Sequence, residues 1–275
     1  MRELGFQKPP ASRENRFCQS ILISPLRNSE FSHASQPSTR GTSSGATLRI
    51  SETFTSRQGE GVLTGTESYF IRTSGCNLRC WFCDTPYASW KPTGEFVSVD
   101  QIVQSAVDSG LSHVVLTGGE PMLPPDSVGL AKSLRDAGLH LTIETAGTID
   151  RDIQCDLMSI SPKLQSSTPN AKEHPRWNEL HEARRLPINV MRGLIDRAKQ
   201  FQIKFVVDSP ADYDEVNEIA AALGVSPGDV WIMPQGSTIE AMDASIEWLK
   251  PWTNEQGYVY CDRLQIRWFG NRRGT

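Results

Sequence analysis

Long apolar runs are absent from this 275-residue sequence, and none approaches the ~18 residues that a membrane-spanning helix needs. The first 20 residues are mostly polar, so the apolar segment of a secretory signal peptide is missing as well. Neither sign of charge dominates, and the net charge of −4 gives no strong attraction to nucleic acid or to a membrane surface. We therefore expect a protein of the reducing cytoplasm that has no membrane partner and no nucleic-acid partner.

Histidine is scarce, and the two histidines nearest to the cysteine cluster, His33 and His113, lie far from it in the sequence. The cluster CNLRCWFC contains three of the six cysteines: Cys76, Cys80 and Cys83. In a reducing compartment, cysteines this close together indicate metal binding or catalysis rather than disulfides. A closed structural zinc site needs a fourth ligand, usually from a second cysteine pair. No such pair is present, because the remaining cysteines are isolated: Cys18, Cys155 and Cys261.

Three thiolates at these gaps suit a soft metal or an iron–sulfur cluster. On a cluster of four irons, three protein ligands leave one iron free to take a small molecule. The missing fourth ligand would then be the functional position of the site. Zinc binding, a redox-active dithiol and three buried structural cysteines are the alternatives that the spacing leaves open.

Residues 1–46 differ in composition from the rest of the chain. They are rich in Ser and Thr, contain six Arg or Lys against three Glu, and show no periodic apolar face. Such a segment buries too little apolar surface to offset the entropy cost of ordering it. We expect residues 1–46 to be a disordered N-terminal extension; an organellar transit peptide or a start codon placed too far upstream are alternatives. Residues 47–275 form the globular domain.

Strand-like and helix-like segments alternate through this domain. The helical patterns lie at 98–110, 126–138, 188–201, 211–224 and 239–250. Apolar runs typical of buried strands lie between them, at 68–73, 113–118, 139–145, 155–161, 203–208 and 229–234. This alternation predicts a parallel sheet covered by helices. Six such strands are fewer than the eight of a closed barrel, so we predict an α/β fold built as a partial parallel β/α barrel.

Glycine-rich and polar stretches follow the predicted strands one after another. The stretches are 74–83, TGGEP at 117–121, ETAGT at 144–148, SPK at 161–163 and MPQG at 233–236. In parallel α/β folds the reactive surface lies beyond the carboxyl ends of the strands. We therefore expect all five stretches to meet at one edge of the sheet.

CNLRCWFC followed by GGEP resembles the radical S-adenosylmethionine superfamily. Within it, TSRQGEG at 55–61 and FIRTSGCNLRCWFCDT at 70–85 resemble the 7-carboxy-7-deazaguanine synthases of queuosine and 7-deazapurine biosynthesis. The further segments LTGGEP, IETAGT, SPK, KFVV, MPQG and WFGNRRGT extend the likeness over about residues 48 to 275. The resemblance implies that residues 47–275 are the catalytic domain.

The resemblance also implies the cofactors. A 4Fe-4S cluster would be held by Cys76, Cys80 and Cys83, and its open iron would chelate S-adenosylmethionine, whose reductive cleavage yields a radical that abstracts hydrogen from the substrate. A flavodoxin or ferredoxin would supply the electron, Thr85 would ligate Mg²⁺, and Asp84 would orient the loop. S-adenosylmethionine would be bound by Phe82, Gly118, Gly119, Glu120, Ser161, Pro162, Lys163, Met233, Pro234, Gln235 and Gly236.

The implied substrate is 6-carboxy-5,6,7,8-tetrahydropterin, and the implied reaction contracts its ring to 7-carboxy-7-deazaguanine with loss of ammonia. The enzyme would be a carbon–nitrogen lyase and a homodimer. The substrate would be bound by Arg57, Gln58, Gly59, Arg72, Thr117, Gln265 and Thr275.

The chain departs from the family pattern in four places, of which the N-terminal extension, residues 1–46, is one. Gln265 stands where members often have a histidine, Arg57 stands where an apolar residue is common, and the segment 165–187 matches nothing in the pattern. That segment would be an insertion that covers the site or a surface for a partner. The rival functions are a radical activase of an anaerobic reductase, another radical enzyme with a related pterin or purine substrate, and a non-catalytic iron–sulfur or zinc-binding module.

Overall fold

The structure is a computed structural model that describes residues 45–275. The predicted disorder of residues 1–46 therefore lies almost wholly outside the described residues. The first strand begins at Thr47, where the sequence predicts the start of the globular domain. None of the helices in this described part combines the length and the apolarity that a membrane crossing requires.

The core of the described domain is a nine-stranded sheet in the order β3-β1-β2-β4-β5-β6-β7-β8-β9. Strand β1 (Thr47–Arg57) runs antiparallel to both of its neighbours, β2 (Glu67–Thr73) and β3 (Glu95–Ser98). The first and last strands of the order do not pair, so the sheet stays open, which confirms the predicted partial barrel. From β2 onward all neighbours are parallel, through β4 (His113–Gly118), β5 (His140–Thr145), β6 (Leu157–Ile160), β7 (Phe201–Val207), β8 (Val230–Pro234) and β9 (Val259–Tyr260).

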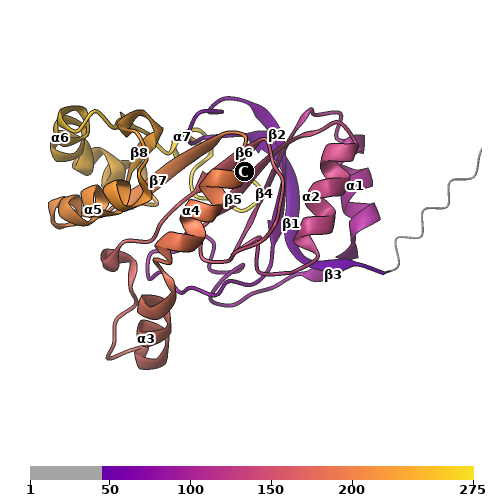
Figure 1. Cartoon of the computed structure of the whole chain (residues 1–275), viewed down its shortest axis with the longest axis horizontal. Coiled ribbons are helices and arrows are strands. Elements are labelled where there is room, and N and C mark those ends of the chain that lie inside the picture. Colours follow the sequence, from indigo (N-terminus) through magenta and orange to yellow (C-terminus); the bar gives the residue numbers. More distant parts are fainter. Residues whose placement is uncertain (1–44) are drawn as a thin grey trace, which may run out of the picture. The chain divides into compact units, whose positions relative to one another are not determined.

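The helices connect the strands in the expected alternation. Figure 1 shows α1 and α2 beside the β1 end of the sheet and α5 and α6 beside β8, with α3 set apart below α4. The helices are α1 (Val99–Asp108), α2 (Ser127–Asp136), α3 (Pro175–Arg184), α4 (Ile188–Arg197), α5 (Tyr213–Leu223), α6 (Ile239–Glu255) and α7 (Leu264–Phe269).

Local sequence explains why these elements form. The hydroxyl of Ser98 accepts the backbone N–H of Gln101, whose side chain reaches back to the Ser98 N–H, and this capping box starts α1. The central strands are apolar because helices cover them, and Leu116, Ile143 and Phe205 are fully buried.

The sequence-based assignment missed five elements: β1, β3, β9, α3 and α7. Strand β1 reads TLRISETFTSR, whose frequent polar residues hide it from a search for apolar runs. Helix α3 has few apolar residues and shows no apolar stripe. The helix predicted at 188–201 was wrong at its end, because α4 stops at Arg197 and Phe201 already begins β7.

Candidate active site

A cavity of about 710 Å³ opens at the carboxyl edge of the parallel strands. The cysteine loop after β2, the TGGEP turn after β4, the loops after β5, β6 and β8, and the C-terminal segment all contribute to its wall. All but three of the predicted site residues line it, so the expected convergence at one edge is confirmed. The three that do not line it are Glu120, Pro162 and Pro234.

The three clustered cysteines face this cavity as free thiols. Burial raises the pKa of Cys76 to about 12 and that of Cys80 to about 11, which favours the neutral thiols in the metal-free protein. Within residues 45–275 no three His, Cys, Asp or Glu side chains are close enough to hold a single metal ion. Cysteine thiolates are the usual ligands of an iron–sulfur cluster, so the three thiols suit one by their chemistry.

The cysteine loop is shaped by close backbone contacts with the TGGEP turn. The backbone N–H of Glu120 donates to the carbonyl of Gly75 at 2.8 Å. A Cβ added to Gly119 would lie 2.3 Å from that same carbonyl oxygen and 2.5 Å from the carbonyl oxygen of Ala88. The second glycine of TGGEP is therefore needed because two backbones meet there without room for a side chain.

The Glu120 carboxylate points into the protein rather than into the cavity. It accepts hydrogen bonds from the Thr145 hydroxyl at 2.8 Å and from the backbone N–H groups of Ala146 at 2.9 Å and Met122 at 3.0 Å. Burial raises the pKa of this carboxyl, and the three donors oppose that effect. Glu120 thus joins the TGGEP turn to the loop after β5, while its contact with a cofactor stays a prediction.

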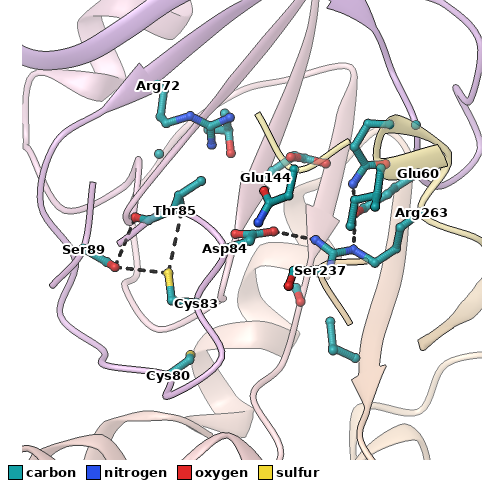
Figure 2. Close-up of a pocket in the computed structure, with 18 of the residues that line it drawn as sticks. Glu60, Arg72, Cys80, Cys83, Asp84, Thr85, Ser89, Glu144, Ser237 and Arg263 are labelled. Atoms are coloured by element: carbon teal, nitrogen blue, oxygen red, sulfur yellow. Dashed lines mark hydrogen bonds and ion pairs between the residues drawn. The ribbon is translucent and has the colours of Figure 1, made fainter. Parts of the chain in front are cut away.

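Thr85, the predicted Mg²⁺ ligand, lines the cavity beside the last cysteine. The sulfur of Cys83 lies 3.7 Å from the Thr85 hydroxyl and 3.1 Å from the hydroxyl of Ser89 (Figure 2). Asp84 pairs with the guanidinium of Arg263 at 2.5 Å, and its part in orienting the loop stays a prediction.

A network of charged side chains on the other side of the cavity went unnoticed in the sequence. Glu60 accepts hydrogen bonds from Lys204 at 3.1 Å, Arg263 at 3.2 Å and Gln265 at 2.6 Å. Figure 2 shows the contact with Arg263. Lys204 also binds Glu144 at 2.7 Å. Burial alone would raise the pKa of the Glu60 carboxyl. The positive charges of Lys204 and Arg263 have the larger combined effect and hold that pKa well below its usual range. The sequence did contain a hint of this network: Glu60 lies in QGEG and Lys204 in KFVV, and both segments carry the family resemblance.

Arg72, predicted to face the substrate, is held from the side by Glu52. Its Nε donates to the Glu52 carboxylate at 2.7 Å, and its guanidinium lies 5.7 Å from the ring centre of Phe54. The same carboxylate accepts hydrogen bonds from the Tyr87 hydroxyl at 2.8 Å and from Arg273 at 3.0 Å. Since Nε is engaged, the guanidinium has a fixed direction on the cavity wall.

Comparison with known proteins connects this geometry to a family. The model of the radical SAM superfamily matches residues 70–249. The 7-carboxy-7-deazaguanine synthase of Rhodopirellula baltica is 56% identical over 88% of this chain and 95% of its own length. That of Halobacterium salinarum is 44% identical over 81% of this chain and 90% of its own length.

The chain belongs to the 7-carboxy-7-deazaguanine synthases. The predicted family is therefore confirmed, and the rival assignments to an activase or a binding module are not supported. As a radical SAM enzyme, this synthase family uses a 4Fe-4S cluster and S-adenosylmethionine. The crystal structure of QueE from Escherichia coli, with a TM-score of 0.58 and 22% identity over 78% of this chain and 93% of that one, agrees in fold.

Proposed function

We propose that this chain converts 6-carboxy-5,6,7,8-tetrahydropterin to 7-carboxy-7-deazaguanine and ammonia, as a radical carbon–nitrogen lyase. The observation that carries the proposal is one cavity whose wall joins three free thiols to a buried carboxylate and two cations. A protein that only bound a cluster would not need the carboxylate and the two cations on the opposite wall of the cavity. A partner-activating enzyme would present a docking face in its place.

Cys76, Cys80 and Cys83 would hold the cluster, and the backbone at Gly118 and Gly119 would approach the bound S-adenosylmethionine. When both are bound, they supply the radical that removes hydrogen from the substrate. Lys163 would also bind that cofactor; it lines the cavity, and its Nζ donates to the Ser161 hydroxyl at 2.6 Å.

The Glu60 network suits the nitrogen-rich edge of a pterin. A carboxylate accepts hydrogen bonds only, and the ring presents N–H donors along that edge. Glu60 is ionised because Lys204 and Arg263 flank it, so it stays an acceptor at neutral pH. Gln265 donates to Glu60, and its Oε1 is buried without a hydrogen-bond partner, so that oxygen is available to a substrate N–H.

Arg72 would bind the substrate carboxylate. Glu52 holds its Nε, which leaves the terminal nitrogens as the fork that matches a carboxylate. The hydroxyl of Thr85 would ligate Mg²⁺ together with substrate oxygens and water, which suits a cation that keeps much of its hydration shell. The cation would steady negative charge on the substrate carboxylate.

A flavodoxin or ferredoxin as the electron donor, a homodimeric assembly and a cytoplasmic location complete the proposal. The absence of nucleic-acid and membrane partners also stays a prediction.

Anaerobic incubation of the reconstituted protein with S-adenosylmethionine, a reductant and 6-carboxytetrahydropterin tests the function directly. Formation of 7-carboxy-7-deazaguanine and ammonia, lost in a Cys80→Ala control, supports it. Cleavage of S-adenosylmethionine without that product would point to another radical enzyme. Omitting Mg²⁺, or replacing Thr85 by Val, tests the cation site separately.

A further inference from the structure

The segment 165–187 lies against the cysteine loop. It contains the short helical turn Gln165–Ser167, shortly after SPK, and α3 (Pro175–Arg184). Although α3 stands apart from the sheet in Figure 1, its inner face contacts the residues between the cysteines. We call residues 164–185 the clasp.

Carbonyl groups of the clasp accept two hydrogen bonds from Trp81, which lies between the second and third cysteines. The backbone N–H of Trp81 donates to the carbonyl of Ser167 at 3.1 Å. Its indole N–H donates to the carbonyl of Ser166 at 2.7 Å. These bonds fix both the backbone and the side chain of the residue that follows Cys80.

His181, on α3, binds the residue that precedes Cys80. Its side chain is fully buried, and its Nδ1 accepts the backbone N–H of Arg79 at 3.2 Å. Because Nδ1 is an acceptor, the neutral ring carries its proton on Nε2, which lies 2.9 Å from the hydroxyl of Ser167. Nε2 therefore donates to Ser167, whose hydroxyl donates in turn to the carbonyl of Leu164 at 2.6 Å.

Ser167 connects His181 to the residue that follows Cys80. The Ser167 hydroxyl is bonded to Nε2 of His181 and to the carbonyl of Leu164, and the Ser167 carbonyl accepts the backbone N–H of Trp81. Hydrogen bonds to the sulfurs and solvent exposure set the reduction potential of an iron–sulfur centre, so the position of the backbone beside Cys80 bears on it.

Two arginines hold the first gap of the cysteine loop. The guanidinium of Arg79 lies 4.0 Å from the ring centre of Trp177 on α3, and it donates to the carbonyl oxygens of Cys76 and Leu78, each at 2.7 Å. From α3, Arg184 donates to the carbonyl of Asn77 at 3.3 Å. Every gap between the cysteines is thus in contact with the clasp.

We propose that the clasp holds the cysteine loop in the shape that receives the cluster, and that His181 is the positioning residue that orients Ser167 and the backbone before Cys80. The inference rests on the proposed function only in taking the three cysteines as cluster ligands. It concerns cluster retention and cluster electronics, which are measured without substrate.

Substitutions at His181 separate its two hydrogen bonds. His181→Asn keeps an acceptor near the position of Nδ1, His181→Gln keeps a donor near the position of Nε2, and His181→Ala keeps neither. Glu179→Ala changes an exposed residue of the same helix and is the matched control. Each protein is reconstituted anaerobically, passed through a desalting column and analysed for iron and sulfide, for the electron paramagnetic resonance spectrum of the reduced cluster, and for its midpoint potential.

We expect His181→Ala to lose iron about tenfold faster than the parent protein, since partners that orient metal ligands typically affect affinity by ~10–100-fold. His181→Asn should recover retention, because the Arg79 contact returns. His181→Gln should recover the spectrum and the potential, because the donor to Ser167 returns and the Ser167 carbonyl again holds Trp81 beside Cys80. A residue that merely supported the fold would not divide the two readouts in this way.

Parental iron content, spectrum and potential in His181→Ala would overturn the proposal. Circular dichroism of the apoproteins checks the fold. If His181→Ala is unfolded, Ser167→Ala tests the next residue of the same chain of hydrogen bonds. An unchanged spectrum and potential in Ser167→Ala would then overturn it. Failure to turn over the pterin would leave these measurements unaffected, so the two hypotheses fail independently.

Discussion

Lys204 on β7 and Glu60 after β1 form a buried ion pair across the candidate active site, with 3.1 Å between Nζ and Oε2. Glu144 on β5 binds the same ammonium group at 2.7 Å, so one cation is shared by two carboxylates from different elements. The two ion pairs tie the loop after β1 to the middle of the parallel sheet. The position of the proposed acceptor for the pterin edge therefore depends on a lysine far away in the sequence.

Replacing Lys204 by Met should destabilise the protein strongly. The change leaves Glu144 without its cation and Glu60 with Arg263 alone, and removing one partner of a buried pair costs about 3–5 kcal/mol. Urea denaturation of the apoprotein measures the loss. Adding Glu144→Gln should restore part of it; if the double variant is less stable than Lys204→Met, the carboxylates do not depend on this cation.

Glu60 should make the fold sensitive to acid. Its pKa in the folded protein is below the unfolded value of 4.5, so its contribution to stability is fully present above that pH and is lost as the pH falls through the folded value. Glu60→Gln should show a flatter decline of unfolding free energy below about pH 4.5 than the parent. Acid titrations of both proteins, followed by circular dichroism, check this. Equal slopes of unfolding free energy against pH would count against the prediction.

Gln265→His should introduce a titration into substrate binding. Gln265 donates a hydrogen bond to Glu60 at 2.6 Å and stays neutral at every pH of the assay, whereas histidine changes charge near pH ~6.5. We expect the KM of the variant for the pterin to vary between about pH 5.5 and 7.5 while that of the parent stays flat across the same range. Steady-state assays at several pH values compare them, and identical profiles would show that position 265 does not contact the substrate.

Gly119→Ala should impair cluster binding. The new Cβ would lie 2.3 Å and 2.5 Å from the carbonyl oxygens of Gly75 and Ala88, so the cysteine loop would have to move. Iron content after reconstitution should fall severalfold. Gly129→Ala, on α2, is the matched control. Apart from its chain neighbours and the backbone of its own helix, no atom lies within 4 Å of the added Cβ, and the change should stabilise the helix by roughly 0.5–1 kcal/mol.

Arg72→Lys should weaken substrate binding although the charge is kept. Lysine cannot engage Glu52 through one nitrogen and a carboxylate through a fork. Losing a hydrogen bond between charged groups, worth ~1.5–3 kcal/mol, should lower kcat/KM by roughly 10–100-fold. Cleavage of S-adenosylmethionine without substrate should continue, and a parental kcat/KM would place Arg72 outside the substrate contacts.

The parallel strands could be predicted from the sequence, because buried parallel strands are continuous apolar runs. The glycine-rich stretches follow these strands. Strand β1 and helix α3 could not, because their residues are largely polar and gain their order from neighbours. In β1, the charge of Glu52 marks the residue that orients Arg72, yet a carboxylate in a strand looks like any solvated side chain until its partner is known. The same holds for His181, an ordinary polar residue in a segment without a motif.

The sequence by itself determined the alternation of strands and helices, the cysteine spacing and the motifs that identify the family, because these depend on neighbours along the chain. Only the tertiary structure decided which charges meet. Lys204 reaches Glu60 and Glu144, and His181 reaches the backbone of Arg79, because the sheet order and the packing of the clasp bring distant segments together. Hydrogen bonds and ion pairs act over a few ångströms in space, and no local pattern records a contact between residues so far apart in the chain.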